Sequence, residues 1–184
     1  MVKSIKVYQN FNIKKDHKNS IILIGNFDGL HVGHQKLFSL AKKYKKKHKI
    51  KIGVFTFEPM PKMFFNKKLK NFRISNKIQK IDLLEKFGVD FVIIKKFDKN
   101  FSKTKSINFI KDILSKKLNA RFIFVSNNFR FGNKREGDVK QLIKYKDIFN
   151  YKIIKPKPLF IKNKIVSSSL IRDFLQRGKL KEVN

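Results

Sequence analysis

Two histidines three residues apart stand where glycine is most concentrated in the chain. His31 and His34 fall within residues 25–34, which also hold three of the eight glycines. At the start of a helix this spacing lets two side chains point the same way, beside free backbone amides and the positive end of the helix dipole. Phosphate binds at such places, and imidazoles can donate hydrogen bonds to its oxygens. We therefore predict an anion site, with Gly33 leaving room for backbone or ligand.

Two other interpretations of the histidine pair stay open from the residues alone. Both side chains could be ordinary surface residues of a helix start, or they could ligate zinc together with Asp28. No third soft ligand is evident, and the phosphate hypothesis explains the tight turns that Gly25 and Gly29 allow. The segment matches neither G-x-x-x-x-G-K-[ST] nor G-x-G-x-x-G, so kinases and dehydrogenases lose support.

Strand and helix patterns alternate along the chain and must position these residues. An apolar run at residues 20–25 predicts a buried strand before the histidines, and one apolar face over residues 34–47 predicts a helix after them. Further strands are predicted at residues 49–57, 89–94, 121–125 and 152–155, and further helices at residues 76–87, 106–118, 138–145 and 168–177. This alternation is typical of an open, mostly parallel α/β sheet with helices on both faces. Ligands of such sheets bind beyond the carboxyl ends of the strands.

The helix over residues 76–87 carries the clearest end signals. Asn76 and Gln79 have the spacing of a capping box, and Gly88 is the left-handed residue that ends a helix. Its apolar positions are expected to face inward: Ile78, Ile81, Leu84 and Phe87. Gly178 similarly ends the last helix.

Net charge is the most unusual property of the composition. The chain has 184 residues, suiting one domain, and a formal net charge of +32 with an isoelectric point near 10.4. Such basicity ordinarily suggests nucleic acid. However, 39 of the 45 cations are Lys, spread along the whole chain, and Lys, Ile, Asn and Phe, which have AT-rich codons, make up 98 residues. We expect no specific nucleic-acid partner, but a positive field that attracts anionic substrates.

Membrane and secretory classes find no support in the sequence. No apolar run approaches the ~20 residues of a membrane span, and residues 1–10 lack the apolar core of a secretory signal. The absence of cysteine excludes disulfides and thiolate metal sites. We therefore expect a cytoplasmic protein with no membrane partner.

The string Gly-Asn-Phe-Asp-Gly-Leu-His-Val-Gly-His at residues 25–34 carries a family resemblance. Its end resembles the HxGH signature of the nucleotidyltransferase superfamily. The whole string is similar to the FMN adenylyltransferase module of bacterial bifunctional riboflavin kinase/FMN adenylyltransferases, the FAD synthetases. The resemblance implies a Rossmann-like, nucleotidyltransferase-type sheet in a single domain over residues 1–184. The family's C-terminal riboflavin kinase domain has no counterpart in this sequence, so the protein is expected to be either natively fused to such a domain or a natural single-activity form.

Three later segments extend the resemblance along the chain. Residues 57–61 are similar to the family's F-E-P-x-P, whose two prolines predict a stiff, extended loop. Residues 125–138 resemble V-G-x-D/N-F-x-F-G-x-x-x-x-G-D, with Ser126 where the family usually has Gly. Residues 166–172 resemble I-S-S-T-x-I-R, with Ser169 for Thr and Leu170 for a frequent Arg. Three serines before a helix could alone be a plain cap.

The resemblance also implies a reaction: ATP and FMN give FAD and pyrophosphate, without a covalent enzyme intermediate. Mg²⁺ is expected mainly through the substrate phosphates rather than in a protein metal site. Catalytic roles would fall to His31, His34 and Arg172. ATP would be bound by Gly25, Asn26, Phe27, Asp28, Gly29, His31, Gly33, His34, Ser168, Ser169 and Arg172. FMN would be bound by Phe57, Pro59, Phe65, Asn128, Arg130 and Phe131.

Chemical reasoning supports several of these assignments, and two rival functions remain. Asn128 can present a donor and an acceptor to a flavin edge, Phe131 can lie against the ring, and Arg130 can pair with phosphate. Phe64 and Phe65 offer apolar surface to a flat ring, although either could be core. The rivals are an HxGH transferase with another acceptor (pantetheine phosphate, nicotinamide mononucleotide or glycerol phosphate) and a basic nucleic-acid-binding protein.

Overall fold

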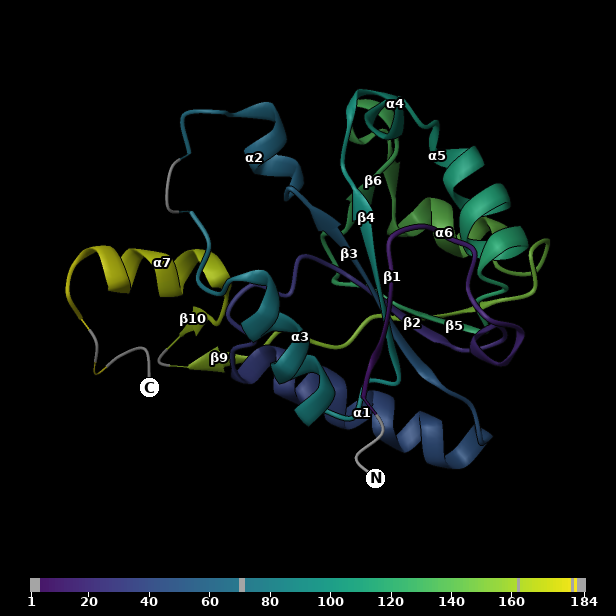
Figure 1. Cartoon of the computed structure of the whole chain (residues 1–184), viewed down its shortest axis with the longest axis horizontal. Coiled ribbons are helices and arrows are strands. Elements are labelled where there is room, and N and C mark those ends of the chain that lie inside the picture. The colour runs from purple at the N-terminus through teal and green to yellow at the C-terminus, as the bar shows by residue number, and fades with distance from the viewer. Residues whose placement is uncertain (1–3, 70–71, 162, 180, 182–184) are drawn as a thin grey trace.

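Short apolar runs build one six-stranded parallel sheet, which contains the five predicted strands and one more (Figure 1). The computed structural model describes residues 4–69, 72–161, 163–179 and 181. The strand order is β1-β4-β3-β2-β5-β8. The strands are β1 (Lys6–Tyr8), β2 (Ile21–Ile24), β3 (Ile52–Glu58), β4 (Phe91–Lys96), β5 (Phe122–Phe124) and β8 (Lys152–Ile154). Two antiparallel pairs lie apart from it: β6 (Arg130–Phe131) with β7 (Gly137–Asp138), and β9 (Phe160–Ile161) with β10 (Lys164–Ile165).

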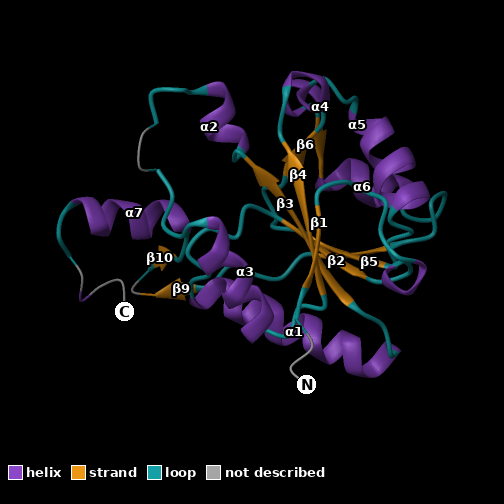
Figure 2. Cartoon of the chain, in the orientation of Figure 1, coloured by secondary structure: helices purple, strands orange, loops and turns teal. Residues whose placement is uncertain are grey.

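Helices cover both faces of the sheet, because successive strand residues point to opposite sides (Figure 2). Ile22 and Ile24 belong to one core cluster, whereas Ile21 and Leu23 belong to the other. The helices are α1 (Val32–His48), α2 (Pro61–Phe65), α3 (Lys77–Lys86), α4 (Lys99–Ser102), α5 (Ser106–Asn108), α6 (Val139–Tyr145) and α7 (Ser168–Gln176). A π-helix, η2 (Phe109–Lys117), continues α5, and two short 3-10 turns are η1 (Lys15–His17) and η3 (Asn133–Arg135). The first cluster lies beneath α5, η2 and α6, and the second beneath α1 and α3.

The order in which strands are added to the sheet reverses next to β2. From β2 it moves through β3 to β4, and it then returns to place β5 on the other side of β2. The carboxyl ends of β2 and β5 therefore flank the switch point, where open α/β sheets bind ligands. Residues 25–34 and 125–132 follow these two strands, so both predicted ligand segments lie at this edge of the sheet.

The structure corrects several local predictions. Ile78 does not face inward, since it is 71% exposed, whereas Ile81, Leu84 and Phe87 pack in the core as predicted. The loop over residues 57–61 is extended only as far as Met60, because Pro61 is the first residue of α2. Proline is tolerated there, since the first N–H of a helix has no partner within the helix. The strand predicted from residue 49 begins only at Ile52, since Lys49 ends α1 with a φ of 52°. The pattern also missed β1 and the two small hairpins.

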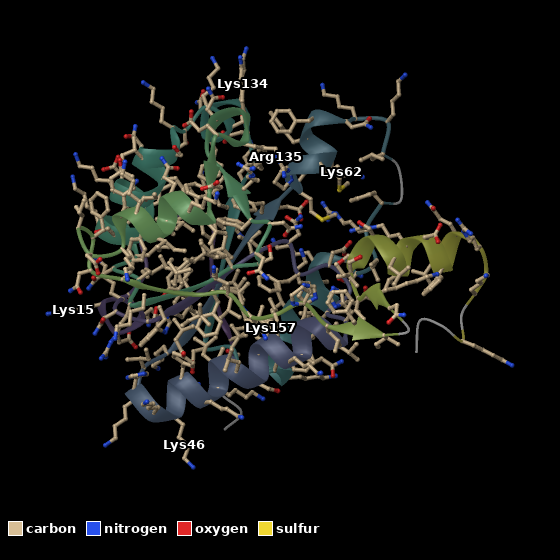
Figure 3. The ribbon with its side chains drawn as sticks, turned by 180° about the vertical axis from the view of Figure 1, so that it is seen from behind. Lys15, Lys46, Lys62, Lys134, Arg135 and Lys157 are labelled. Carbon is tan, nitrogen blue, oxygen red and sulfur yellow. The ribbon has the colours of Figure 1, made fainter. Side chains whose placement is uncertain are left out.

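Basic side chains are spread over the surface rather than gathered. Figure 3 shows Lys46 on α1, Lys134 and Lys15 at well-separated parts of the molecule, and all three are exposed. Within the described residues, no helix is long and apolar enough to cross a membrane.

Gly53 in β3 has no space for a side chain and provides a test of the sheet. A Cβ there would overlap the ring of Phe91, its partner on β4. We expect Gly53→Ala to lower the free energy of unfolding by about 1–3 kcal/mol through overpacking. Urea unfolding measures this change. Gly178→Ala is the control: its Cβ would meet nothing within 4 Å, so only its φ of +67° costs stability. A smaller loss for Gly53→Ala than for Gly178→Ala would contradict the packing of β3 on β4.

Candidate active site

The two histidines come together at the first turn of α1. His31 is the N-cap residue, and its carbonyl oxygen accepts hydrogen bonds from the backbone N–H of His34 and Gln35 at 2.8 and 3.1 Å. The two rings stack with their centroids 3.8 Å apart. Gly33 makes this possible, since a Cβ there would stand 3.1 Å from the His31 ring. The prediction that the two side chains point the same way is confirmed.

Both histidine rings lack polar partners within the described residues. Their buried Nδ1 atoms make no hydrogen bond. Burial lowers the pKa of His31, and burial with the neighbouring His31 lowers the pKa of His34 to about 3. The rings are therefore neutral at pH 7. Unsatisfied buried nitrogens are uncommon in protein cores, and here they stand at a helix N-terminus with no acidic residue in its first turn. This arrangement suits an anionic ligand.

Asp28 joins three separate segments beneath the histidines. Its side chain is 1% exposed and accepts hydrogen bonds from the backbone N–H of Ile74 and Ser75 at 3.1–3.2 Å. It also pairs with the Arg172 guanidinium at 2.7 Å. Its backbone oxygen accepts the hydroxyl of Ser168 at 2.8 Å. Asp28 thus fixes the loop after β2 to the segment before α3 and to the start of α7.

Glycine at position 29 allows this close approach. Gly29 has a φ of +76°, and a Cβ there would stand 2.7 Å from the Ile74 side chain. Gly25 is less constrained, with the nearest atoms of the Phe27 ring 3.3 Å from a Cβ. The Phe27 side chain belongs to the core, whereas Asn26 is exposed. Of these loop residues, Asn26 therefore has its side chain accessible to a ligand.

Residues 166–172, which resemble I-S-S-T-x-I-R, form the start of α7. Ser167 is the N-cap residue, and its hydroxyl accepts the backbone N–H of Leu170. Ser169 is exposed, so its hydroxyl is accessible to a ligand. Arg172 is 16% exposed, donates to the carbonyl oxygen of Phe72 at 2.8 Å and lies 3.9 Å from the centroid of that ring. The start of α7 therefore offers the accessible Ser169 hydroxyl, whereas the Arg172 guanidinium is engaged by Asp28 and by the carbonyl oxygen of Phe72.

An aromatic surface follows β3. Phe65 is 71% exposed and contacts the rings of Phe64 and Phe97. Phe57 and Phe101 continue the cluster, with 5.7 Å between their ring centroids. Pro59, two residues after Phe57, is half-buried. Sequence analysis missed the contribution of Phe97, because nothing in its local pattern separates it from the many core phenylalanines.

The third predicted ligand segment lies after β5 and is only partly accessible. Asn128 is exposed, and its Oδ1 accepts the Ser126 hydroxyl at 2.8 Å. Arg130 is exposed and lies 3.8 Å from Asp138. Phe131, however, is 6% exposed within the first core cluster. The structure therefore places Asn128 and Arg130 at the surface and the Phe131 ring in the interior.

Two charged residues of this region were not predicted from the sequence. Arg73 forms an ion pair with Glu58, at the end of β3. Lys80 on α3 is 7% exposed. The signal for Lys80 was available, since it stands four residues before the buried Leu84 and so shares its helix face.

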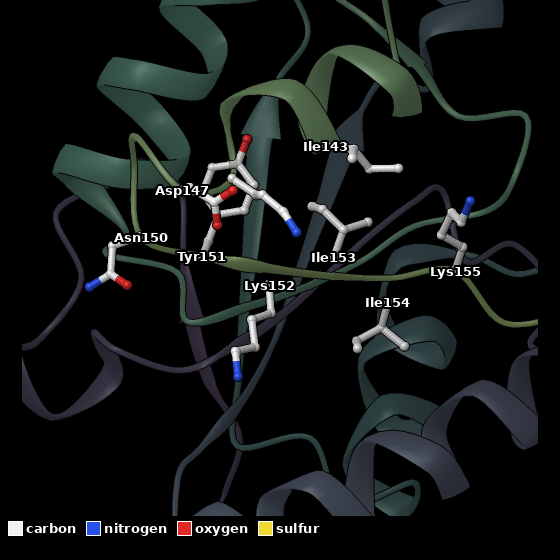
Figure 4. A pocket seen from close by; sticks show the side chains of 9 residues that line it. Ile143, Asp147, Asn150, Tyr151, Lys152, Ile153, Ile154 and Lys155 are labelled. Atoms are coloured by element: carbon white, nitrogen blue, oxygen red, sulfur yellow. The ribbon is translucent and has the colours of Figure 1, made fainter.

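Two cavities among the described residues lie away from the histidine pair. One of about 540 Å³ lies between α6 and β8, with Tyr151, Asp147 and Ile153 among its lining residues (Figure 4). The other, of about 760 Å³, is lined by residues around Phe11, Phe101 and Lys117. Neither lining set includes a predicted site residue.

Comparison with known proteins decides the family. A family profile described as FAD synthetase matches residues 13–170. The chain is 41% identical over 170 residues to the bifunctional riboflavin kinase/FMN adenylyltransferase of Buchnera aphidicola from Schizaphis graminum, covering 92% of this chain and 54% of the relative. The chain belongs to the FAD synthetase family.

Other FAD synthetase relatives agree. The Escherichia coli K12 protein of the same name is 33% identical over 160 residues, covering 87% of this chain and 51% of the relative. The FAD synthetase of Listeria monocytogenes is 31% identical, covering 91% and 68%. The chain spans about half the length of the bifunctional relatives that it matches.

Solved structures confirm the predicted fold. A Streptococcus pneumoniae protein described as a macrolide-efflux protein superposes with a TM-score of 0.82 at 26% identity, over 96% of this chain and 57% of that one. Pantoate–beta-alanine ligase of Francisella tularensis superposes with a TM-score of 0.60 at 16% identity, over 98% and 79%. The chain therefore has the Rossmann-like nucleotidyltransferase fold.

The carboxylates of the described residues do not form a metal cage. In the described part of the chain, no three His, Cys, Asp or Glu residues gather as ligands. Asp28 is also occupied, since its carboxylate accepts two backbone N–H groups and the Arg172 guanidinium. The residues present therefore do not fit a protein-held Mg²⁺, and that ion stays a prediction tied to the substrate phosphates.

The histidine pair predicts how the stability of the ligand-free protein depends on pH. Because the pKa of His34 is about 3 in the folded protein and near 6.5 when unfolded, only the unfolded chain takes up this proton as pH falls below 6.5. The free energy of unfolding should then fall by up to about 1.4 kcal/mol per pH unit through this residue. Urea unfolding of the wild type and of His34→Gln between pH 7 and 5 measures the slope. Equal slopes for the two proteins would contradict the buried, neutral His34.

Proposed function

We propose that the chain transfers AMP from ATP to the phosphate of FMN, giving FAD and pyrophosphate. The observation that carries this proposal is the stacked histidine pair at the start of α1, with its unpartnered ring nitrogens beside the Asp28–Arg172 ion pair. Membership of the FAD synthetase family supports the choice of acceptor. The names of the bifunctional relatives also support native fusion to a riboflavin kinase domain, and a cytoplasmic location suits these substrates.

The reaction requires no nucleophile from the protein. A phosphate oxygen of FMN attacks the α-phosphorus of ATP in line and forms the new P–O bond. The P–O bond to the β-phosphate breaks on the opposite side, and pyrophosphate leaves with the electron pair. Catalysis then consists of positioning the two substrates and stabilising the charge that develops on the phosphate oxygens.

His31 and His34 would provide that stabilisation. Each neutral ring carries one N–H, which can donate a hydrogen bond to a phosphate oxygen. Because the ring is uncharged, no imidazolium has to lose its hydration when it is buried. The backbone amides at the start of α1 and the positive end of its dipole act in the same direction. Ser169 and Arg172 at the start of α7 would bind the triphosphate from the other side.

FMN would lie along the aromatic surface after β3. Phe65 and its neighbours offer ring faces against which a flavin can stack. Asn128, exposed on the loop after β5, offers an amide to the flavin edge. Phe131 lies in the interior, so its ring would support this loop rather than stack on the flavin.

The histidine role predicts a specific loss of catalysis. We expect His31→Ala to keep the fold but to lower kcat by roughly 100-fold or more, because a preorganised donor to the developing charge is lost. Pyrophosphate release from ATP and FMN measures kcat, and circular dichroism reports the fold. Riboflavin, which lacks the attacking phosphate, should not replace FMN.

His48→Ala is the matched control, since His48 ends the same helix without facing the site. It should leave kcat unchanged. Near-normal FAD formation by His31→Ala would overturn the assigned role. Turnover with pantetheine phosphate, nicotinamide mononucleotide or glycerol phosphate in place of FMN would instead identify another transferase.

The aromatic surface predicts a selective effect on FMN. We expect Phe65→Ala to weaken FMN binding by roughly 5-fold or more, as the loss of one stacking partner implies. ATP binding and the melting temperature should not change, because Phe65 is mostly exposed. Quenching of flavin fluorescence measures the affinity. Ile78→Ala, at the same exposure of 71%, is the control, and an equal effect of both changes would contradict a flavin contact.

A further inference from the structure

Lys80 is a buried cation that the proposed reaction does not use. It is 7% exposed and stands on the inward face of α3, one turn before the buried Leu84. The charges that act on it are those of Asp28, Glu58 and Arg73. Both carboxylates are already paired, Asp28 with Arg172 and Glu58 with Arg73. Lys80 itself forms no ion pair with the described residues, so these five charged groups carry one positive charge in excess.

The Lys80 side chain packs into the protein, and no ion pair with the described residues offsets its loss of hydration. Burial lowers the pKa of Lys80. Burying a charge without a partner destabilises a protein, and such lysines are rare. Geometry places Lys80 near Asp28, because Lys80 stands in the first turns of α3 and the residues just before this helix, Ile74 and Ser75, donate their backbone N–H groups to Asp28.

The proposed function creates a need for a second cation at Asp28. Arg172 is bonded to Asp28 and to the carbonyl oxygen of Phe72 in the ligand-free protein. If its guanidinium turns to the triphosphate of ATP, the Asp28 carboxylate loses its counterion while remaining 1% exposed. The backbone N–H groups of Ile74 and Ser75 would still donate to it, but they carry no net charge. Removing one partner from a buried ion pair is strongly destabilising.

We propose that Lys80 becomes the counterion of Asp28 when Arg172 turns to the nucleotide. Lys80 is then a positioning residue that acts through Asp28, and this inference rests on the proposed function of the site. Its flexible four-carbon side chain suits a cation that changes partners, whereas Arg73 remains engaged by Glu58. The loop after β2 keeps its place throughout, because Asp28 is never left unpaired.

Two experiments test this exchange, the first with ATP. Lys80→Met removes the charge at nearly equal length. We expect its affinity for ATP with Mg²⁺, measured by titration calorimetry, to fall at least roughly 10-fold, since the bound state must leave Asp28 unpaired. The melting temperature without ATP should stay the same or rise, because no ion pair is lost and a partly desolvated charge is removed. Lys77→Met, an exposed change on the same helix, is the control for the loss of one positive charge and should bind ATP normally.

The second experiment needs no ligand and so separates this inference from the proposed function. Arg172→Met imitates the departure of the arginine, and Lys80 should then pair with Asp28 and preserve the fold. In that background Lys80→Met should lower the melting temperature by several degrees, although it does not do so in the wild type.

The outcomes are decisive. Equal effects of Lys80→Met in both backgrounds would overturn the exchange, as would an Arg172→Met protein that cannot fold with Lys80 present. Unchanged ATP affinity in Lys80→Met would also overturn it. A wild type that binds no ATP would overturn the proposed function together with the ligand-driven exchange, whereas the coupling of Lys80 to Arg172 would still appear in the melting temperatures.

Discussion

The buried carboxylate of Asp28 holds together three parts of the chain that are far apart in the sequence. It ties the loop after β2 to the segment before α3 through the N–H groups of Ile74 and Ser75, and to α7 through Arg172. A carboxylate buried this deeply requires all of its partners, because each lost donor would leave charge without compensation. The geometry of the histidine pair depends on this constraint, since His31 stands only three residues beyond Asp28.

The parallel sheet provides the platform on which this constraint operates. Because β2 lies at the switch point, the loop that follows it opens toward the ligand side, next to the loop after β5. Gly53 lets β3 lie closely against β4, and Gly29 lets the loop approach Ile74. The aromatic surface after β3 and the histidines after β2 then lie along one edge, where two anionic substrates can meet. The positive charge of the chain, spread widely, favours their approach.

The candidate site combines unpartnered neutral histidines with an arginine that already forms an ion pair. The histidines are neutral and unpartnered, whereas Arg172 is already engaged by Asp28. In the proposed function Arg172 would leave Asp28 to bind phosphate, and Lys80 on α3 would supply the cation that this exchange needs. Stability and substrate binding are therefore linked through one small group of charges.

The sequence by itself determined the alternation of strands and helices, the histidine pair and the family. These features are local: hydrophobic period, the capping box at Asn76 and the glycine spacing over residues 25–34 act within a few residues. Tertiary structure alone decided that Ile78 is exposed, that Phe131 is buried and that Asp28 binds Arg172. Such facts depend on contacts between distant segments, and neither periodicity nor spacing records which residues meet when the sheet is assembled. The charged cluster around Lys80 belongs to this second kind.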